Sequence, residues 1–387
     1  MAFCIESVIR RISSNAVRKL STVAEPVRLP PEEPLQLFRT NECNPINHTT
    51  DHLKRFYTIS PNERQRLFFN NAMPKAFVDD VKTFNECSIM IRRPALEIMS
   101  YLHQCDYSRP VNKFVMYGEL GSGKSISLMH LVHYGHKSGH IIVHVSWLQR
   151  WYEFPKEYAK STIREGLTDL PIESATWLGH FKIQNKHLLD TLDLRTSKDY
   201  IWSARESNPK GTPILEVIDF GISRIKFASE IIIILMEELK QWCADNKCKV
   251  MVLIDGFNAL ISNHTRVRNE NKKFVSTQDV TITHAFLDIT KSNWNNGVVI
   301  VSVDKLAVKE TRDSDLPRYL LQEKGFEHLD PFIPIKVENF DDGEFEMMIE
   351  YYKDRKWIRN ITPNAQRELQ LLTNNNPKQL SLYCASL

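Results

Sequence analysis

The feature that most constrains the fold of this chain is a glycine-rich segment, Gly118-Glu-Leu-Gly-Ser-Gly-Lys-Ser125. An apolar run at 114–117 precedes it, and a helical pattern at 124–137 follows it. The segment has the pattern G-x-x-x-x-G-K-[S/T], in which the glycines permit positive φ so that successive N–H groups converge on phosphate. It therefore predicts a strand, a phosphate-binding turn and a helix in immediate succession.

The residues predicted to contact a nucleotide are the loop and the first turn of the helix after it. Lys124 is expected to reach the outer phosphates as a point charge, and the Ser125 hydroxyl to bind Mg²⁺. The helix directs the positive end of its dipole at the anion. The predicted ligand is a purine nucleoside triphosphate with Mg²⁺, and the alternative is a plain glycine turn. The predicted set is Gly118, Glu119, Leu120, Gly121, Ser122, Gly123, Lys124, Ser125 and Ile126.

A second apolar run, at 249–254, ends in Asp255. A carboxylate that a strand delivers beside a phosphate loop usually holds the magnesium shell, so Ser125 and Asp255 form the predicted Mg²⁺ site. Gly256 follows, at a position where an active enzyme of this arrangement commonly has a glutamate that polarises water. Its absence weakens the expectation of fast hydrolysis, because a base must lie within hydrogen-bond reach of the water.

Two polar residues are weak candidates for a catalytic or phosphate-sensing role. Glu119, inside the loop, either points toward the outermost phosphate or is a solvated acid. Ser302, near the end of the fourth predicted strand, either senses that phosphate or is a small residue in a buried strand. No residue is predicted to be catalytic beyond these two candidates.

Five apolar runs separated by helical patterns predict the fold class. Near-continuous apolar strands that alternate with helices indicate a parallel sheet covered on both faces, with ligands at the carboxyl ends of its strands. Another strand and much sequence intervene between the two motifs. We therefore expect an α/β P-loop NTPase fold of the AAA+-like branch, which has an additional strand between them. The runs lie at 114–117, 140–147, 249–254, 297–303 and 332–337. Between the second and third runs, residues 150–212 are expected to be mostly helical and residues 222–244 to form a long helix.

The chain divides into four predicted regions. Residues 1–24 are rich in Arg and Ser, poor in acids and amphipathic, which is typical of a mitochondrial presequence; a frayed basic terminus is the alternative. Residues 25–85 form an N-terminal extension that starts as a Pro-rich arm. Residues 86–340 form the P-loop NTPase domain, and residues 341–387 a C-terminal helical lid. With no apolar run of about 18 residues, we expect no transmembrane helix.

Composition narrows the class of protein further. The net charge is only +3, from 50 basic and 47 acidic residues, which argues against a general nucleic-acid coat but not against a local basic patch. A chain of 387 residues buries enough core to fold without disulfides, so its seven scattered cysteines indicate reduced thiols. Cys243 with Cys248, and His130 with His133 and His136, lack further ligands at metal-site spacing, and we expect no metal there.

A segment rich in aromatic and basic residues follows the second predicted strand. Such a mixture suggests a platform on which RNA bases stack, but its helical spacing favours core packing. The residues are Trp147, Trp151, Tyr152, Phe154 and Tyr158 with Arg150, Lys156 and Lys160.

Four stretches of the chain belong together: Ile91-Arg-Arg-Pro-Ala-Leu-Glu97, the loop with Tyr117, Asp255-Gly-Phe-Asn-Ala-Leu260 and Asp330-Pro-Phe-Ile-Pro-Ile335. They resemble the death-associated protein 3 family, the P-loop proteins of the mitochondrial small ribosomal subunit. The tail is also similar, from Glu344-Phe345 through Tyr351-Tyr352 to Asn376-Pro377. The resemblance is colinear over about residues 85–387, which makes it far more specific than the loop alone.

The resemblance implies a protein of the mitochondrial matrix that lies in the head of the small ribosomal subunit, near the large subunit. Its implied partners are small-subunit proteins and rRNA, with the large subunit across the interface and no membrane. The implied ligand is GTP or GDP with Mg²⁺, although ATP stays open because no guanine-reading motif is present. Weak GTPase activity at most, support of mitochondrial translation and a link to apoptosis are also implied.

Two other functions compete with that of a structural, nucleotide-binding ribosomal protein. One is a cycling mitochondrial GTPase or ATPase that acts in subunit assembly or cell-death signalling. The other is a free nucleic-acid-dependent ATPase of the same fold, which the predicted presequence and the modest net charge disfavour.

Overall fold

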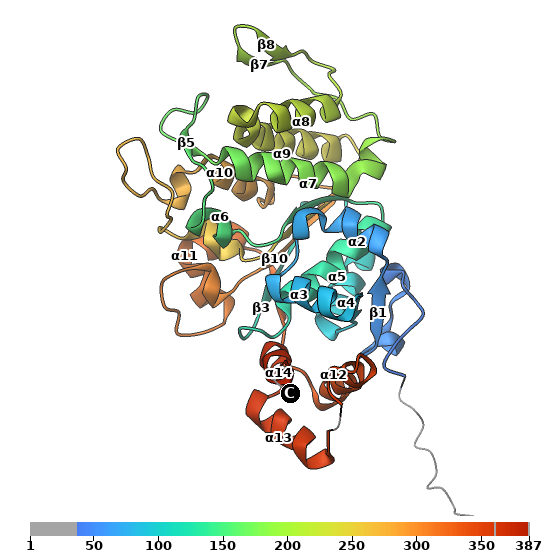
Figure 1. Cartoon of the computed structure of the whole chain (residues 1–387). Helices are drawn as coiled ribbons and strands as arrows, with labels where there is room; N and C mark the ends of the chain where they lie inside the picture. The colour runs from blue at the N-terminus through green and yellow to red at the C-terminus, as the bar shows by residue number, and fades with distance from the viewer. Residues whose placement is uncertain (1–36, 360, 386–387) are drawn as a thin grey trace, which may run out of the picture. The chain divides into compact units, whose positions relative to one another are not determined.

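The computed structural model describes residues 37–359 and 361–385. The described residues from Phe38 onward form a compact unit (Figure 1). The predicted presequence, residues 1–24, and the first part of the predicted N-terminal extension lie outside the described residues.

A five-stranded parallel sheet forms the centre of this unit, which confirms the predicted α/β class. Four of its strands are almost completely buried because helices cover both faces, as expected for a parallel sheet, whereas the edge strand β11 exposes Pro334 and Lys336. In spatial order the sheet runs β11, β3, β10, β9, β4. The strands are β3 (Asn112–Tyr117), β4 (Ile141–Val145), β9 (Val250–Ile254), β10 (Gly297–Ser302) and β11 (Ile333–Lys336).

A strand does lie in space between the one that precedes the loop and the one that precedes Asp255. This strand is β10, which pairs with both, Ile300 standing opposite Phe114 on one side and Leu253 on the other. The strand that intervenes along the chain, β4, lies instead at the edge of the sheet. Sequence order alone therefore did not show which strand separates the two motifs, since strand order is set by the crossovers.

Side chains on alternate strand positions enter two separate cores. On one face Val115, Val143 and Val252 pack against helices α7, α9 and α10. On the other face Phe114 and Met251 pack against α4 and α5. These helices are α4 (Arg93–Gln104), α5 (Lys124–Lys137), α7 (Pro171–Leu189), α9 (Ala228–Ala244) and α10 (Thr281–Ile289); α11 (Pro317–Leu329) precedes β11.

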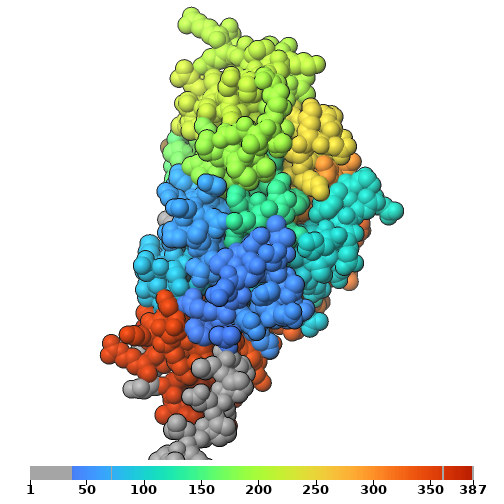
Figure 2. Space-filling view, turned by 90° about the vertical axis from the view of Figure 1, so that its right-hand side faces the viewer, coloured from blue at the N-terminus to red at the C-terminus, as the bar shows by residue number. Residues whose placement is uncertain are grey.

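Part of the predicted N-terminal extension completes the second core. Tyr57, Ile59 and Leu67 are buried there together with residues of β3 and α5. Strands β1 and β2 pair in antiparallel fashion. Figure 2 shows these residues, in blue, between the C-terminal helices and the green helical layer. The elements of the extension are β1 (Phe56–Ile59), α2 (Pro61–Leu67) and α3 (Lys75–Phe84), and β2 (Cys87–Met90) follows directly after it.

The stretch at 150–212, which the sequence predicted to be mostly helical, contains one long helix, α7, and two short antiparallel strand pairs. The helix predicted at 222–244 is shorter, because α8 ends at Ser223 and a 3-10 turn, Ile225–Phe227, precedes α9. The other elements of this region are α6 (Gln149–Glu153), β5 (Ala159–Lys160), β6 (Thr168–Asp169), β7 (Tyr200–Ser203), β8 (Glu206–Asn208) and α8 (Ile214–Ser223).

Three C-terminal helices confirm the predicted helical tail: α12 (Asp342–Asp354), α13 (Pro363–Thr373) and α14 (Pro377–Cys384). Each helix has a polar residue at its N-cap, namely Asp341, Thr362 or Asn376. The side chain of that residue accepts a hydrogen bond from the backbone N–H three residues further on. A third core forms around these helices, in which Phe56 stacks on Tyr351 at 4.4 Å between ring centres. Within the described residues, none of the helices combines the length and apolar character needed to cross a bilayer.

Candidate functional site

The glycine loop lies at the carboxyl edge of the sheet, where β3 ends and α5 begins. Gly118, Gly121 and Gly123 have φ values of +146°, +84° and +101°. Side chains other than glycine rarely adopt such values, so the three glycines allow the chain to turn tightly into the helix. The predicted order of strand, loop and helix is present.

Lys124 is buried, with 5% of its surface exposed, at the centre of the loop. Its ammonium group donates to the carbonyl oxygens of Gly118 at 2.7 Å and Glu119 at 2.8 Å. It also forms an ion pair with Asp304 at 2.9 Å. An ammonium group has three N–H donors, so the protein itself already satisfies this lysine. An anion that binds here competes with Asp304 for the same charge.

Asp255 connects the loop helix to the neighbouring strand. One of its carboxylate oxygens accepts a hydrogen bond from Ser125 Oγ at 2.6 Å, and the other accepts one from Ser302 Oγ. Ser302 Oγ in turn accepts the backbone N–H of Gly256 at 2.9 Å. The structure thus brings together three residues that the sequence placed at this site from three separate elements.

Burial raises the pKa of Asp255 to about 6, and the negative charge of Asp304 adds to the effect. The hydrogen bonds from Ser125 and Ser302 and the charge of Lys124 act in the opposite direction. A cation close to Asp255 would lower this pKa, because a positive charge favours the ionised form of the carboxyl group.

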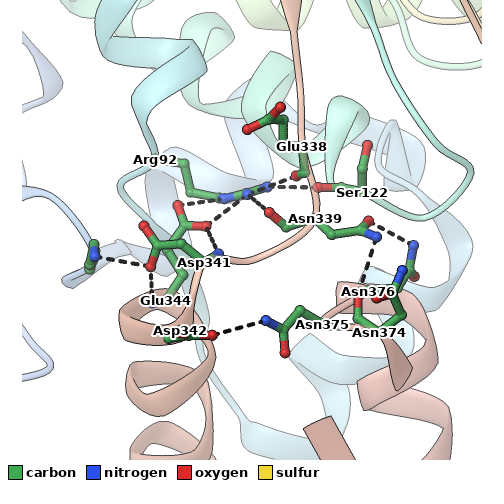
Figure 3. A network of polar contacts seen from close by, with 11 residues as sticks. Arg92, Ser122, Glu338, Asn339, Asp341, Asp342, Glu344, Asn374, Asn375 and Asn376 are labelled. Atoms are coloured by element: carbon green, nitrogen blue, oxygen red, sulfur yellow. Dashed lines mark hydrogen bonds and ion pairs between the residues drawn. The ribbon is translucent and has the colours of Figure 1, made fainter. Parts of the chain in front are cut away.

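The C-terminal region holds the loop from its outer side (Figure 3). Asn376 Nδ2 donates to Leu120 O at 3.0 Å, and the Lys378 N–H donates to Gly121 O at 3.3 Å. A Cβ atom on Gly121 would come within 2.6 Å of Lys378 Cβ. The glycine is therefore needed for this contact with α14 as well as for its positive φ.

Arg92 is a buried cation that ties the loop to the C-terminal region. Its guanidinium donates to Ser122 O at 2.6 Å and forms a two-pronged ion pair with Glu344, both bonds at 2.9 Å. It also donates to the Glu338 carbonyl at 2.9 Å and lies 4.9 Å from the centre of the Phe340 ring. Such a paired geometry is the strong form of the arginine–carboxylate interaction.

With these contacts, the outward-facing carbonyls of the loop orient its amide groups. The N–H and C=O of a trans peptide point in opposite directions. Because Leu120 O faces Asn376 and Ser122 O faces Arg92, the N–H groups of Gly121 and Gly123 point away from these two donors. Ser122 Oγ is fully buried and has no hydrogen-bond partner among the described residues. Unpaired donors beside Lys124 are the groups that a phosphate requires.

The remaining predicted residues are placed as follows. Glu119 is exposed, and its carboxylate accepts from Asn339 Nδ2 at 2.9 Å, which gives it a protein partner beside the C-terminal region. Leu120 is 42% exposed. Ile126 packs its side chain against the second core, so that only its backbone is left to take part in binding.

Three important contributors were missing from the predicted set: Asp304, Arg92 and Asn376. Asp304 lies two residues beyond Ser302, and the Asn258 amide positions it by donating to Asp304 O at 2.8 Å and accepting from Asp304 N at 3.1 Å. Its place at the end of β10 was a sequence signal that pointed to the site. Arg92 and Asn376 are far from the loop in sequence, and only the fold brings them to it.

The residues present fit a nucleotide and a magnesium ion. Lys124 and the loop amides suit phosphate, and Ser125 and Asp255 supply hydroxyl and carboxylate oxygens, the donors that Mg²⁺ prefers. The described residues contain no group of three or more His, Cys, Asp or Glu that could hold a metal by itself. A magnesium ion bound at this site would take its other ligands from phosphate oxygens and water, as is usual for this ion.

The fold and the site define an α/β protein with a glycine-lysine-serine loop at the carboxyl edge of a parallel sheet, clamped by its own C-terminal helices. A family model described as mitochondrial ribosomal death-associated protein 3 matches residues 89–382. The chain belongs to this family, as its sequence motifs predicted.

Two relatives carry the name small ribosomal subunit protein mS29. The one from Mus musculus is 32% identical over 364 residues, 93% of this chain and 92% of the relative. The one from Bos taurus is 34% identical over 364 residues, 93% of this chain and 91% of the relative. One chain of the solved E. coli MS115-1 HORMA:CdnC:Trip13 complex also matches, at 10% identity. The match covers 85% of the present chain and 95% of the chain in that complex. Its TM-score is 0.25, too low to support any argument.

Proposed function

We propose that this chain is a component of the small subunit of the mitochondrial ribosome that binds a purine nucleotide with Mg²⁺ and so supports mitochondrial translation. The ribosomal part rests on the family and on the two relatives named mS29, each of which matches more than nine-tenths of this chain. The nucleotide part rests on the convergence of Lys124, Ser125 and Asp255 at the glycine loop.

In this proposal the nucleotide is held rather than rapidly hydrolysed. Gly256 follows Asp255, and Glu119, the one acid of the loop, accepts a hydrogen bond from Asn339. With no other acid assigned to activate water, hydrolysis is expected to stay in the slow intrinsic range of unassisted GTPases, roughly 10⁻⁴ to 10⁻³ s⁻¹. The proposed nucleotide is GTP or GDP, as the resemblance implies, with ATP as the alternative. A role in apoptosis, which the resemblance also implies, is part of the same proposal.

The nucleotide proposal is tested with the purified full chain. Any co-purified nucleotide is extracted and identified by mass spectrometry, and affinity for fluorescent GDP and ADP analogues is measured with and without Mg²⁺. Lys124→Ala is expected to weaken binding at least about tenfold, whereas Asp304→Asn strengthens it because the competing charge is gone. Equal affinities for these two variants would reject the site.

The ribosomal proposal is tested separately by sedimentation. A tagged chain expressed in cells is expected to migrate with the small ribosomal subunit when a mitochondrial lysate is run on a sucrose gradient. If the tagged chain stays at the top of the gradient, the ribosomal assignment fails whatever the purified chain binds. Lys124→Ala is expected to lower the assembled fraction, and an unchanged profile for this variant argues against a role of the nucleotide in assembly.

A further inference from the structure

Residues 150–160 and 263–276, far apart in sequence, form one continuous surface. The Arg266 N–H donates to Tyr152 O at 2.8 Å, and Lys160 pairs with Glu270 at 3.4 Å. Figure 1 shows the second segment, in gold, projecting beside β5, and Figure 2 shows it standing at the surface. We call residues 150–160 and 263–276 the aromatic–basic surface.

Three aromatic rings of this surface face solvent. Phe154 and Phe274 are 62% and 61% exposed, and Tyr158 is 41% exposed. Within the part of the chain that the structure describes, Phe154 and Phe274 are the exposed phenylalanines. The core packing expected for this segment holds for Tyr152, which is buried and bonded to Thr283, but not for Phe154 and Tyr158. Exposed rings contribute little to folding, so their gathering in one place points to a binding surface.

Cations accompany the exposed rings. The guanidinium of Arg266 lies 5.5 Å from the centre of the Phe154 ring, and that of Arg268 lies 4.8 Å from the centre of the Phe274 ring. The two segments together contain seven Lys or Arg residues against three Glu. This local excess of positive charge contrasts with the near-neutral chain as a whole.

A hollow of about 480 Å³ opens in the same surface. Phe274 and Arg266 line it, together with His264, Asn263 and Lys309. Its walls therefore offer an aromatic face, positive charges and an amide that both donates and accepts hydrogen bonds. The volume falls in the range of small-ligand pockets and suits a single nucleobase with its sugar.

We propose that the aromatic–basic surface binds single-stranded RNA. Unpaired bases stack on Phe154, Tyr158 and Phe274, while the neighbouring cations neutralise the sugar–phosphate backbone. A duplex fits less well, because its bases are already stacked and cannot reach the rings. An acidic peptide would use the positive charge but would leave the rings unexplained.

The choice of RNA as the natural polyanion rests on the proposed ribosomal role, but the binding itself does not depend on the nucleotide loop. The experiment measures fluorescence anisotropy of a labelled 12-nucleotide oligouridine titrated with the full chain at three salt concentrations. The double variant F154A/F274A is expected to weaken binding at least about tenfold at every salt concentration. Arg266→Gln with Arg268→Gln is expected to weaken it and to flatten the salt dependence.

Controls separate this surface from general polyanion binding and from the nucleotide site. Ile201→Ala, which alters a 77% exposed side chain on β7, is expected to leave RNA affinity unchanged. Lys124→Ala is also expected to bind RNA normally, so that failure of the nucleotide site remains distinguishable. Wild-type affinity in F154A/F274A, or equal competition by polyglutamate and by unlabelled single-stranded RNA, overturns the proposal.

Discussion

In the glycine loop the carbonyls from Gly118 to Ser122 each accept a hydrogen bond from Lys124, Arg92 or the start of α14. In the aromatic–basic surface, by contrast, large rings and long cations extend into solvent with few contacts. The loop is held in one shape by buried polar groups, whereas the exposed rings of the surface contribute little to stability. Substitutions in the loop should therefore lower the stability of the fold. Substitutions of the exposed side chains of the aromatic–basic surface should lower RNA binding and leave stability almost unchanged.

Acidification is expected to have a large effect on stability, through buried histidines of the helix that follows the loop. Burial lowers the pKa of His133 to about 3 and that of His136 to about 4. Both histidines stay neutral in the folded chain between pH 6.5 and pH 5, whereas in the unfolded chain they take up protons over this range. Each such histidine is therefore expected to cost roughly 1–2 kcal/mol between pH 7 and pH 5. Urea unfolding at pH 7, 6 and 5 measures this.

The variant His136→Leu provides a control for the pH effect. It removes one group that protonates on unfolding, so the slope of unfolding free energy against pH should fall by about one proton. A wild-type urea midpoint that is the same at pH 7 and pH 5 would contradict the assignment of these histidines as buried and neutral.

Arg92→Ala is expected to destabilise the chain by about 3–5 kcal/mol, because it leaves Glu344 buried without its partner. Both side chains of this ion pair are only 8% exposed. The exposed pair of Lys336 with Glu338 offers a matched comparison, and Lys336→Ala should cost far less stability because solvent screens an exposed ion pair. Chemical denaturation measures both, and equal losses would show that the Arg92 network does not hold the loop.

Gly121→Ala is expected to cost about 2–4 kcal/mol, from positive φ and from the close approach of α14. Gly166 isolates the first cause, since its φ of +82° is close to the +84° of Gly121 but a Cβ there would meet no atom within 4 Å. Gly166→Ala should thus cost only about 1–2 kcal/mol. If thermal or urea unfolding gives the two variants equal stability, α14 does not press on the loop.

Phe154→Ala and Phe274→Ala are expected to have the smallest effect, within about 0.5 kcal/mol of wild type in urea unfolding. Their rings are mostly exposed, so little apolar burial is lost. A loss of more than about 2 kcal/mol in the free energy of unfolding for either variant would show that its ring stabilises the fold, and the contrast with the loop would then fail.

Much of the fold followed from local pattern. The five strands and the helices at 124–137 and 341–387 are found where apolar runs and helical periodicity predicted them. The helix expected at 222–244 begins later, and the segment at 150–212 contains strand pairs, because turns and short hairpins leave weaker signals than long periodic elements. Of the candidate site, Lys124, Ser125, Asp255 and Ser302 were named from the motif and the strand ends, and the structure joins Ser125 and Ser302 to Asp255.

By itself, then, the sequence determined a phosphate-loop motif, an alternating α/β order and membership of a family, because these depend on neighbours along the chain. Only the tertiary structure decided that β10 separates the two motif strands and that Asp304 pairs with Lys124. It also brought Arg92 and Asn376 onto the loop and joined 150–160 to 263–276. The reason is physical: such contacts join residues distant in sequence, and the packing of the sheet and its helices sets them rather than local propensity.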